Sequence, residues 1–352
     1  MALTNRENWL ATARRTRPEW IPTNVVVSHA TRNQLRDEVE EVMARHPFLF
    51  PDFQPGQIDW DTHCFGPGHT ADQPFRDAWG CVWESTVDGL EGQVLEHPLA
   101  TWDALATWQP PDPLTQADRG PMDWAAARRR AEEARSCGEV VSGSLAHGFL
   151  LMRLWYLRGF ENLMLDIATD EPRLQALIDL LVAHSLVLVQ QWLDLDVDCM
   201  GFPEDLGTQT GSIISPAKFH RWITPAYARL VEPCHAAGVL VHQHSDGHVI
   251  ELMEEFAASG RDIVNLQDLV NGIDNIAATL KGRVCIDLDL DRQKIVPFGT
   301  RREIRDLIEE EVRKLGSPQG GLMFTCGIYP PTPPENIDAV CTALEEFRTH
   351  YW

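Results

Sequence analysis

Several familiar signatures are missing from this sequence, and each absence excludes a class of protein. The eight cysteines contain no Cys-x-x-Cys pair, which argues against a disulfide framework and favours a reducing cytosol. No Gly-x-Gly-x-x-Gly fingerprint or Walker loop is present, which argues against nucleotide binding. The N-terminus lacks an apolar signal core, and no apolar run approaches the roughly 18 residues that span a bilayer. We therefore expect a cytoplasmic protein without a membrane partner.

Basic residues are also scarce. The 30 lysines and arginines stand against 52 acidic residues, which gives a formal charge of −22. This balance argues against nucleic acid and anionic membrane surfaces as partners. With 352 residues, of which 44% are apolar, the chain can bury a sizeable core. It suits one large α/β barrel or two ordinary domains.

Residues 46–125 differ from the rest of the chain. They are rich in Pro, Gly, Trp, Asp and His and show little periodicity. Six of the 12 tryptophans lie in this segment, and a seventh, Trp20, precedes it. Loops of this length inside a compact protein are usually functional caps. The flat apolar side chains could line a pocket for a flat organic ligand. The alternative is that they only hold a loop-rich segment together.

Strand and helix patterns alternate through the remainder of the chain. We expect helices at about 5–20, 31–45, 123–136, 161–168, 170–194, 216–237, 248–259, 272–281, 300–316 and 333–349. We expect strands at 21–30, 138–143, 197–202, 238–242, 262–266, 283–287 and 321–325. This order predicts a (β/α)₈ TIM barrel with an N-terminal loop-rich elaboration, and a doubly wound open sheet is the alternative. Residues 1–122 would form the elaboration, cap and first barrel elements, and residues 123–352 the barrel body, within one structural domain.

Polar residues that follow the apolar strands are the candidates for chemistry, because barrel active sites gather at that face. They are Glu204, Asp205, His242, His244, Asp246, Gln267, Asp268, Asp287, Asp289, Asp291 and Cys326. Zinc binds thiolate, imidazole and carboxylate ligands. In an extended segment His244 and Asp246 lie on one side, since side chains alternate with period two. Cys326 could supply a third ligand, and Glu204 or the substrate a fourth.

Each candidate also has a purely structural interpretation. His242 could be a buried, hydrogen-bonded histidine, and Asp289 and Asp291 could be solvated or ion-paired with Arg292. Cys326 alone would more often be a small buried apolar residue than a ligand.

A set of motifs over residues 75–350 links these candidates. They are Asp77-Ala-Trp79-Gly80-Cys-Val-Trp83, Leu157-Arg158-Gly159-Phe-Glu161-Asn162, Asp205-Leu-Gly207-Thr-Gln209-Thr-Gly211, Ile214-Ser215-Pro216, His244-Ser-Asp246-Gly247 and Thr332-Pro-Pro334-Glu335-Asn336-Ile337. Through them the chain resembles the uroporphyrinogen decarboxylase-like superfamily. The resemblance implies a (β/α)₈ barrel.

The superfamily contains decarboxylases and corrinoid-dependent methyltransferases. The decarboxylases clamp their substrate with an N-terminal Arg-Gln-Ala-Gly-Arg loop, which is absent from the Ala-Arg14-Arg15-Thr-Arg17 segment here. The methyltransferases bind zinc through His-x-Cys and a later Cys. His244 and Cys326 match this pattern, whereas Asp246 replaces the first Cys. A carboxylate makes the site harder, which suits zinc acting on an ether oxygen, as in aryl O-demethylation.

The resemblance therefore implies a methyltransferase that acts on a small methylated substrate, such as a methoxyarene. Its predicted metal ligands are His244, Asp246, Cys326 and Glu204, and its predicted catalytic residues are His244, Asp246 and Asp205, with Asp205 as a proton donor. Predicted substrate contacts are Trp79, Trp83, Gln209, His242 and Tyr329. No Asp-x-His-x-x-Gly motif is present, so a corrinoid (cobalamin) would arrive on a partner protein.

Several alternatives stay open. They are methyl transfer in the opposite direction, a metal-independent lyase or decarboxylase with His244 and Asp246 as its acid–base pair, and a non-catalytic partner subunit. A homodimer is also an open alternative.

Overall fold

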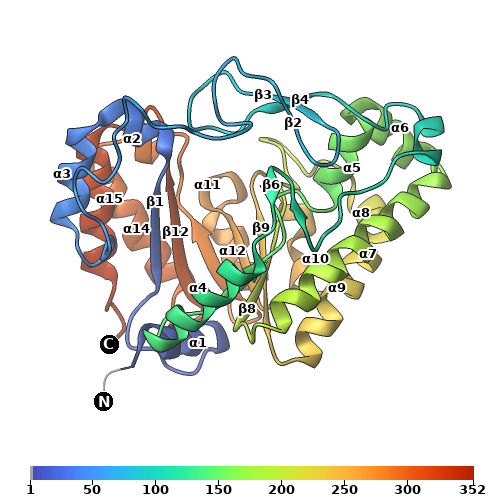
Figure 1. Ribbon diagram of the computed structural model, residues 1–352. Helices are drawn as coiled ribbons and strands as arrows, with labels where there is room; N and C mark the ends of the chain where they lie inside the picture. Colours follow the sequence, from blue (N-terminus) through green and yellow to red (C-terminus); the bar gives the residue numbers. More distant parts are fainter. Residues whose placement is uncertain (1–2) are drawn as a thin grey trace.

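The computed structural model describes residues 3–352 and has a curled sheet of seven parallel strands at its centre (Figure 1). The strand order is β1-β12-β11-β10-β9-β8-β7. The strands are β1 (Thr23–Val27), β7 (Ser142–Ser144), β8 (Cys199–Pro203), β9 (Leu240–Ser245), β10 (Ile263–Gln267), β11 (Cys285–Asp289) and β12 (Leu322–Ile328). With helices between successive strands this is a TIM-type barrel, which confirms the predicted fold class.

The sheet differs from the predicted eight-stranded barrel in one respect. Among residues 3–352 it pairs seven strands, and β1 and β7 are its two unpaired edges. The segment between α3 and β7, residues 46–141, adds no strand to this sheet. A seam therefore separates β1 from β7.

Helices surround the sheet and bury their apolar faces against it (Figure 1). Before β8 they are α2 (His29–Leu35), α3 (Asp37–Arg45), α4 (Trp124–Ser136), α5 (Leu151–Arg158), α6 (Phe160–Thr169) and α7 (Arg173–Leu193). After β8 they are α8 (Pro216–Trp222), α9 (Thr224–Ala236), η2 (Ile250–Leu252), α10 (Met253–Ala258), α11 (Asp268–Asn271), α12 (Ile273–Leu280), α13 (Ile295–Phe298), α14 (Arg301–Leu315) and α15 (Pro334–Phe347).

The two ends of the barrel are covered by different parts of the chain. Helix α1 (Asn5–Arg14) closes the amino end, where Trp9 and Ala13 pack on Cys199, Cys285 and Met323. The irregular segment passes over the opposite, carboxyl end (Figure 1). This cap contains β2 (Phe75–Arg76), β3 (Val82–Glu84), β4 (Gln93–Glu96), η1 (Trp102–Ala106), β5 (Gln116–Ala117) and β6 (Gly120–Pro121).

Helix boundaries follow local chemistry and correct some expectations. Ser215 caps α8 by accepting a hydrogen bond from the Lys218 N–H. The single helix expected over 216–237 is instead divided at Ile223, because Pro225 has no N–H and disfavours a continuous helix. The first helix is capped by Thr4 rather than by a residue within it, and it ends at Arg14, earlier than expected.

One described helix, α7, is long and apolar enough to cross a membrane by length and composition alone, contrary to our expectation of no such run. A single helix of this kind is weak evidence for a membrane span, because core helices of barrels have the same composition. Here α7 packs against α9 and β7, and its buried residues, which include Leu174, Leu181 and Val189, share one face.

Candidate functional site

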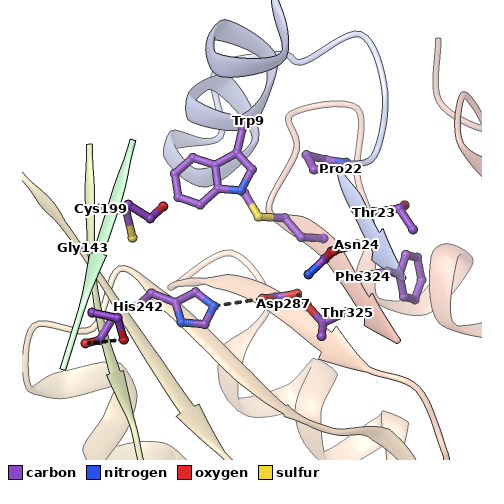
Figure 2. A pocket seen from close by; sticks show the side chains of 14 residues that line it. Trp9, Pro22, Thr23, Asn24, Gly143, Cys199, His242, Asp287, Phe324 and Thr325 are labelled. Atoms are coloured by element: carbon purple, nitrogen blue, oxygen red, sulfur yellow. Dashed lines mark hydrogen bonds and ion pairs between the residues drawn. The ribbon is translucent and has the colours of Figure 1, made fainter. Parts of the chain in front are cut away.

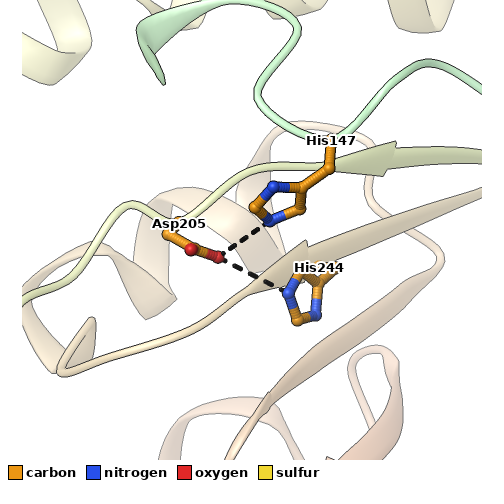
Figure 3. A group of neighbouring side chains, drawn as sticks. All are labelled: His147, Asp205 and His244. Carbon is orange, nitrogen blue, oxygen red and sulfur yellow. Dashed lines mark hydrogen bonds and ion pairs between the residues drawn. The ribbon is translucent and has the colours of Figure 1, made fainter. Parts of the chain in front are cut away.

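Three side chains from neighbouring strand ends converge at the carboxyl end of the barrel (Figure 3). His147 follows β7, Asp205 follows β8, and His244 lies near the end of β9. The Asp205 Oδ1 atom is 3.1 Å from His147 Nε2 and 3.5 Å from His244 Nε2. One nitrogen or oxygen atom from each residue lies within 4.8 Å of the others, so the three could hold one metal ion.

Strand alternation explains why these residues meet. His242 and His244 face the barrel interior, whereas Gln243 and Ser245 are fully buried beneath the helices. Asp246 continues the interior row, with its Oδ1 atom 3.8 Å from His244 Nε2. The sequence correctly predicted that His244 and Asp246 lie on one side.

The loops after β8 and β9 cross in direct contact because both contain glycine. A Cβ atom added to Gly207 would lie 2.6 Å from the backbone N of His248. Gly247 has a φ of +82°, a conformation that side-chain-bearing residues rarely adopt. These two glycines therefore allow Asp205 and Asp246 to approach the same point.

Asn265 on β10 fixes the orientation of His244. The Asn265 Nδ2 donates to the backbone oxygen of Asp287 at 2.8 Å, so its Oδ1 faces His244 Nδ1 and accepts a hydrogen bond from it. One His244 proton therefore lies on Nδ1, and Nε2 is the nitrogen that faces Asp205. Metal-binding histidines typically donate their other ring N–H to an oxygen acceptor in this way.

The electrostatics of the cluster favour charged groups. Burial opposes ionisation of Asp205, but hydrogen bonds from His147 and His244 hold its pKa well below the usual range. Burial also opposes protonation of His244, yet the hydrogen bond with Asp205 and the charge of Asp246 raise its pKa to about 9. Since metal ligands must be deprotonated, a metal would displace this proton on binding.

A second polar group lies beside the cluster. The guanidinium of Arg292 bridges Asp246 and Asp289, with 2.7 Å between its NH2 and Asp289 Oδ2, and lies 5.1 Å from the Tyr329 ring centroid. Burial raises the pKa of Asp289 to about 7, although the nearby Arg292 opposes this shift. Arg292 thus holds Asp246 next to His244.

Two cavities meet at Asp205. The aromatic cavity, of about 510 Å³, is lined by Trp83, Glu91, Gly92, Gln93, Val94, His97, His147, Met152, Trp155, Tyr156, Phe160 and Asp205. The polar cavity, of about 690 Å³, is lined by Asp205, Gly207, Thr208, Gln209, Asp246, Gly247, Gln267, Arg292, Gln293 and Tyr329. The three-residue cluster therefore lies where a hydrophobic ligand and a polar ligand could approach each other.

Two predicted metal ligands lie elsewhere. Thr325 faces the interior and bonds Asp287, so Cys326 next to it points into the helix layer, where its side chain is buried near Cys341 of α15. Burial raises the pKa of the Cys326 thiol, which disfavours the thiolate that a metal needs. The prediction that Cys326 joins His244 is therefore wrong.

Glu204 also points away from the cluster. Its carboxylate accepts hydrogen bonds from the backbone N–H groups of Leu150 and Met152 and from the Tyr227 hydroxyl. The side chain is fully buried, and burial raises its pKa to about 7. Glu204 therefore anchors the start of α5, and the predicted metal role is wrong.

The predicted substrate contacts separate into three places. Trp83 lines the aromatic cavity, Gln209 and Tyr329 line the polar cavity, and His242 lies deeper inside the barrel. Trp79 is 5% exposed and its indole N–H donates to Asp118 Oδ1 at 2.7 Å. It packs behind the aromatic cavity rather than in it, which corrects its predicted role.

Sequence reasoning missed His147 and Asn265, whereas the pairing of Arg292 with Asp289 was one of its structural interpretations and is confirmed. His147 follows β7 by only a few residues, in the same position relative to its strand as the other candidates, and this placement was the available signal. Asn265 lies inside a strand that is buried along its whole length, so no pattern distinguished it. Nothing in the sequence placed Arg292 beside Asp246.

Comparisons with known proteins agree with this fold. The family model described as uroporphyrinogen decarboxylase (URO-D) matches residues 82–347. A uroporphyrinogen decarboxylase from Solibacter usitatus (strain Ellin6076) is 29% identical over 129 residues, and this match spans 36% of either protein. A methyltransferase from Methanosarcina mazei has a similar structure, with a TM-score of 0.64 and 14% identity over 98% of this chain and 99% of the other. At that identity the likeness concerns the fold alone. By the extent of the family match, this chain belongs to the uroporphyrinogen decarboxylase (URO-D) family.

Proposed function

We propose that this chain is a methyltransferase that moves a methyl group between a small methylated substrate and a corrinoid on a partner protein. The observation that supports it best is the position of the His147–Asp205–His244 cluster between the aromatic and polar cavities. A group-transfer enzyme must bring its donor and acceptor to one point from different directions, and this arrangement suits that need.

We propose zinc as the metal, held by His147, Asp205 and His244. Two imidazoles and one carboxylate form a donor set found in catalytic zinc sites, which leave a further position open for substrate. When bound, zinc would act as a Lewis acid on the substrate oxygen. Asp246, next to His244 and paired with Arg292, would set the local charge.

The aromatic cavity is the proposed site of the methylated substrate. Trp83, Trp155, Tyr156 and Phe160 give it flat apolar walls. No Lys or Arg is among its lining residues, whereas two carboxylates are. A neutral methoxyarene suits these walls better than an aromatic acid, whose carboxylate would be a third beside Glu91 and Asp205.

In the proposed reaction the methyl–oxygen bond breaks and both of its electrons stay on the aryl oxygen. The methyl group would leave toward the polar cavity, where a corrinoid on the partner protein would supply the electron pair of the new bond. The aryl oxygen must be stabilised as it gains charge, by the metal or by a proton. The low pKa of Asp205 makes this carboxyl a poor proton donor, so we assign it as a ligand.

Metal analysis tests the proposal. We expect about one zinc per chain in the wild type by plasma mass spectrometry, and loss of zinc in His147→Ala and His244→Ala. Cys326→Ala is the matched control and should keep its zinc, because its side chain faces the helix layer. Circular dichroism would verify that each variant is folded.

A metal-free wild type would overturn the zinc assignment and favour the metal-independent lyase. That alternative has one supporting observation, since His147 and His244 share the Asp205 carboxylate as an acid–base array would. The proposed cellular location is the cytoplasm, in keeping with eight unpaired cysteines.

A further inference from the structure

A third cavity lies inside the barrel and shares no lining residue with the aromatic or polar cavity (Figure 2). Its volume is about 300 Å³. It is lined by Trp9, Pro22, Thr23, Asn24, Ser142, Gly143, Ser144, Cys199, Gly201, His242, Asp287, Met323, Phe324 and Thr325. We call it the inner cavity.

The inner cavity opens at the seam between β1 and β7. Val25 and Val27 of β1 are buried toward the helices, so Asn24 and Val26 face the interior. In a closed barrel such positions are packed in layers. Val26 is instead 50% exposed, because no strand pairs with this edge of β1. The lining of the inner cavity reaches both edges of this seam, with Thr23 and Asn24 from β1 and Ser142 to Ser144 from β7.

The chemistry of the inner cavity centres on one carboxylate. Asp287 is 9% exposed. Its Oδ1 accepts from the Thr325 hydroxyl at 3.0 Å, and its Oδ2 lies 2.9 Å from His242 Nε2. A carboxylate accepts about four hydrogen bonds, so it can still accept from a ligand. The lining includes no Lys or Arg.

An aromatic ring and several hydroxyls complete the lining. The Trp9 indole extends from α1 over the cavity, opposite the His242–Asp287 pair (Figure 2). Ser142 and Ser144 on β7 add neutral polar oxygen atoms. A buried carboxylate, neutral oxygens and an indole face together attract a cation that also has apolar groups.

We propose that the inner cavity is a binding site for a small organic ammonium ion. The ammonium N–H groups would donate to Asp287, and the alkyl groups would pack on Trp9. This site is separate from the proposed methyl-transfer site, and its occupancy does not depend on zinc or on methyl transfer.

Three probes of the same shape test the charge preference on the full-length protein. They are tert-butylammonium, pivalate and tert-butanol, which are cationic, anionic and neutral. The measurement is the indole N–H resonance of Trp9 in a ¹H–¹⁵N spectrum, assigned with Trp9→Phe. We expect a saturable shift with tert-butylammonium and none with pivalate. Pivalate binding as tightly as tert-butylammonium, or no saturable shift with any probe, would overturn the proposal.

Two variants test the location. Asp287→Asn should weaken tert-butylammonium binding roughly tenfold or more, because a charge-assisted hydrogen bond is lost. Asn24→Leu should also weaken binding, and this exposed edge position does not support the core, so the variant should fold. Asp262→Asn is the matched control, since Asp262 bonds His235 and the Val241 N–H and is not among the cavity's lining residues. Unchanged binding in both Asp287→Asn and Asn24→Leu would refute the site.

Discussion

At the scale of single residues, the orientation of His244 depends on one amide. Asn265 accepts from His244 Nδ1 and is itself held by the Asp287 backbone oxygen. Without Asn265 the imidazole could rotate or change tautomer, and its Nε2 would no longer be fixed toward Asp205. Asn265 is thus a positioning residue for the cluster.

We expect Asn265→Leu to lower zinc affinity roughly 10- to 100-fold, the range found when a hydrogen-bond partner of a metal ligand is removed. A chelator competition titration measures this without any turnover assay. Asn275→Leu, at an exposed position on α12, is the control and should leave zinc affinity unchanged. Equal zinc affinity in Asn265→Leu and wild type would contradict the positioning role.

The successes and failures of the sequence prediction at this scale have one cause. His244 and Asp246 were found because period-two alternation fixes which side chains share a face. By the same alternation Cys326 faces the helix layer and not the barrel interior, because adjacent residues of a strand point to opposite sides. The residue chemistry of Cys326 was suggestive, but only the register of β12, with Thr325 inward, decides where its thiol points.

At the scale of elements, α14 carries a buried carboxyl into the barrel wall. Glu311 is fully buried and pairs with the carboxyl of Asp268 at the start of α11, with Asp291 close by. Burial is the main cause that raises the pKa of Glu311 well above its usual value and that of Asp268 to about 6. Burial therefore favours a protonated carboxyl in this pair in the folded state.

This pair predicts a pH dependence of stability. Because the folded pKa values lie above the unfolded ones, the folded state holds protons that the unfolded state releases. The contribution is present below about pH 4 and is lost as pH rises through pH 6 and beyond. We expect Glu311→Gln to gain stability relative to wild type between pH 5 and pH 8, measured by urea unfolding. Glu132→Gln, at an exposed position on α4, is the control. Parallel curves for Glu311→Gln and wild type would contradict a protonated carboxyl in this pair.

The N-terminus of α14 gives a second prediction at this scale. Thr300 and Glu303 form a reciprocal capping box that satisfies free backbone N–H groups. Thr300→Ala should lower the free energy of unfolding by about 1 kcal/mol. Thr349→Ala, an exposed threonine in the C-terminal turn, serves as the comparison. A chemical denaturation midpoint for Thr300→Ala equal to that of wild type would argue against the cap.

Helices and strands were predicted well where the hydrophobic periodicity of the sequence is sustained. They were predicted less well where a single residue interrupts that periodicity. The patterns predict β8 to β12 within a few residues. Arg36, with a φ of 51°, separates α2 from α3 inside what the sequence predicts as one helix. No propensity rule places a left-handed arginine there, so tertiary contacts must decide it.

At the scale of the whole molecule, the sequence predicted the barrel because its strands and helices alternate. It did not predict the seam between β1 and β7. The segment between these two strands, which adds no strand to the sheet, has an irregular composition without periodicity to interpret. The sequence offered a pocket lined by the tryptophans of residues 46–125 as one of two alternatives, and Trp83 does line the aromatic cavity. It did not predict that the aromatic and polar cavities are formed by residues from the cap, from α5 and from the strand ends together. Cavities depend on contacts between distant segments, and a single sequence does not contain that information.

The separation of the two mouth cavities gives the last prediction. If the aromatic cavity binds the methylated substrate, 2-methoxyphenol should bind at least about tenfold more tightly than 4-hydroxy-3-methoxybenzoate, because the lining already contains two carboxylates and no Lys or Arg. Trp155→Ala should weaken 2-methoxyphenol binding by about tenfold, since a large aromatic contact is lost, and should leave zinc content unchanged. Isothermal titration calorimetry measures both effects, with Trp352→Ala, an exposed terminal indole, as the control. Tighter binding of the benzoate, or unchanged binding of 2-methoxyphenol in Trp155→Ala, would place the substrate outside the aromatic cavity. If the same samples retain zinc, the metal assignment stands even though the substrate assignment fails.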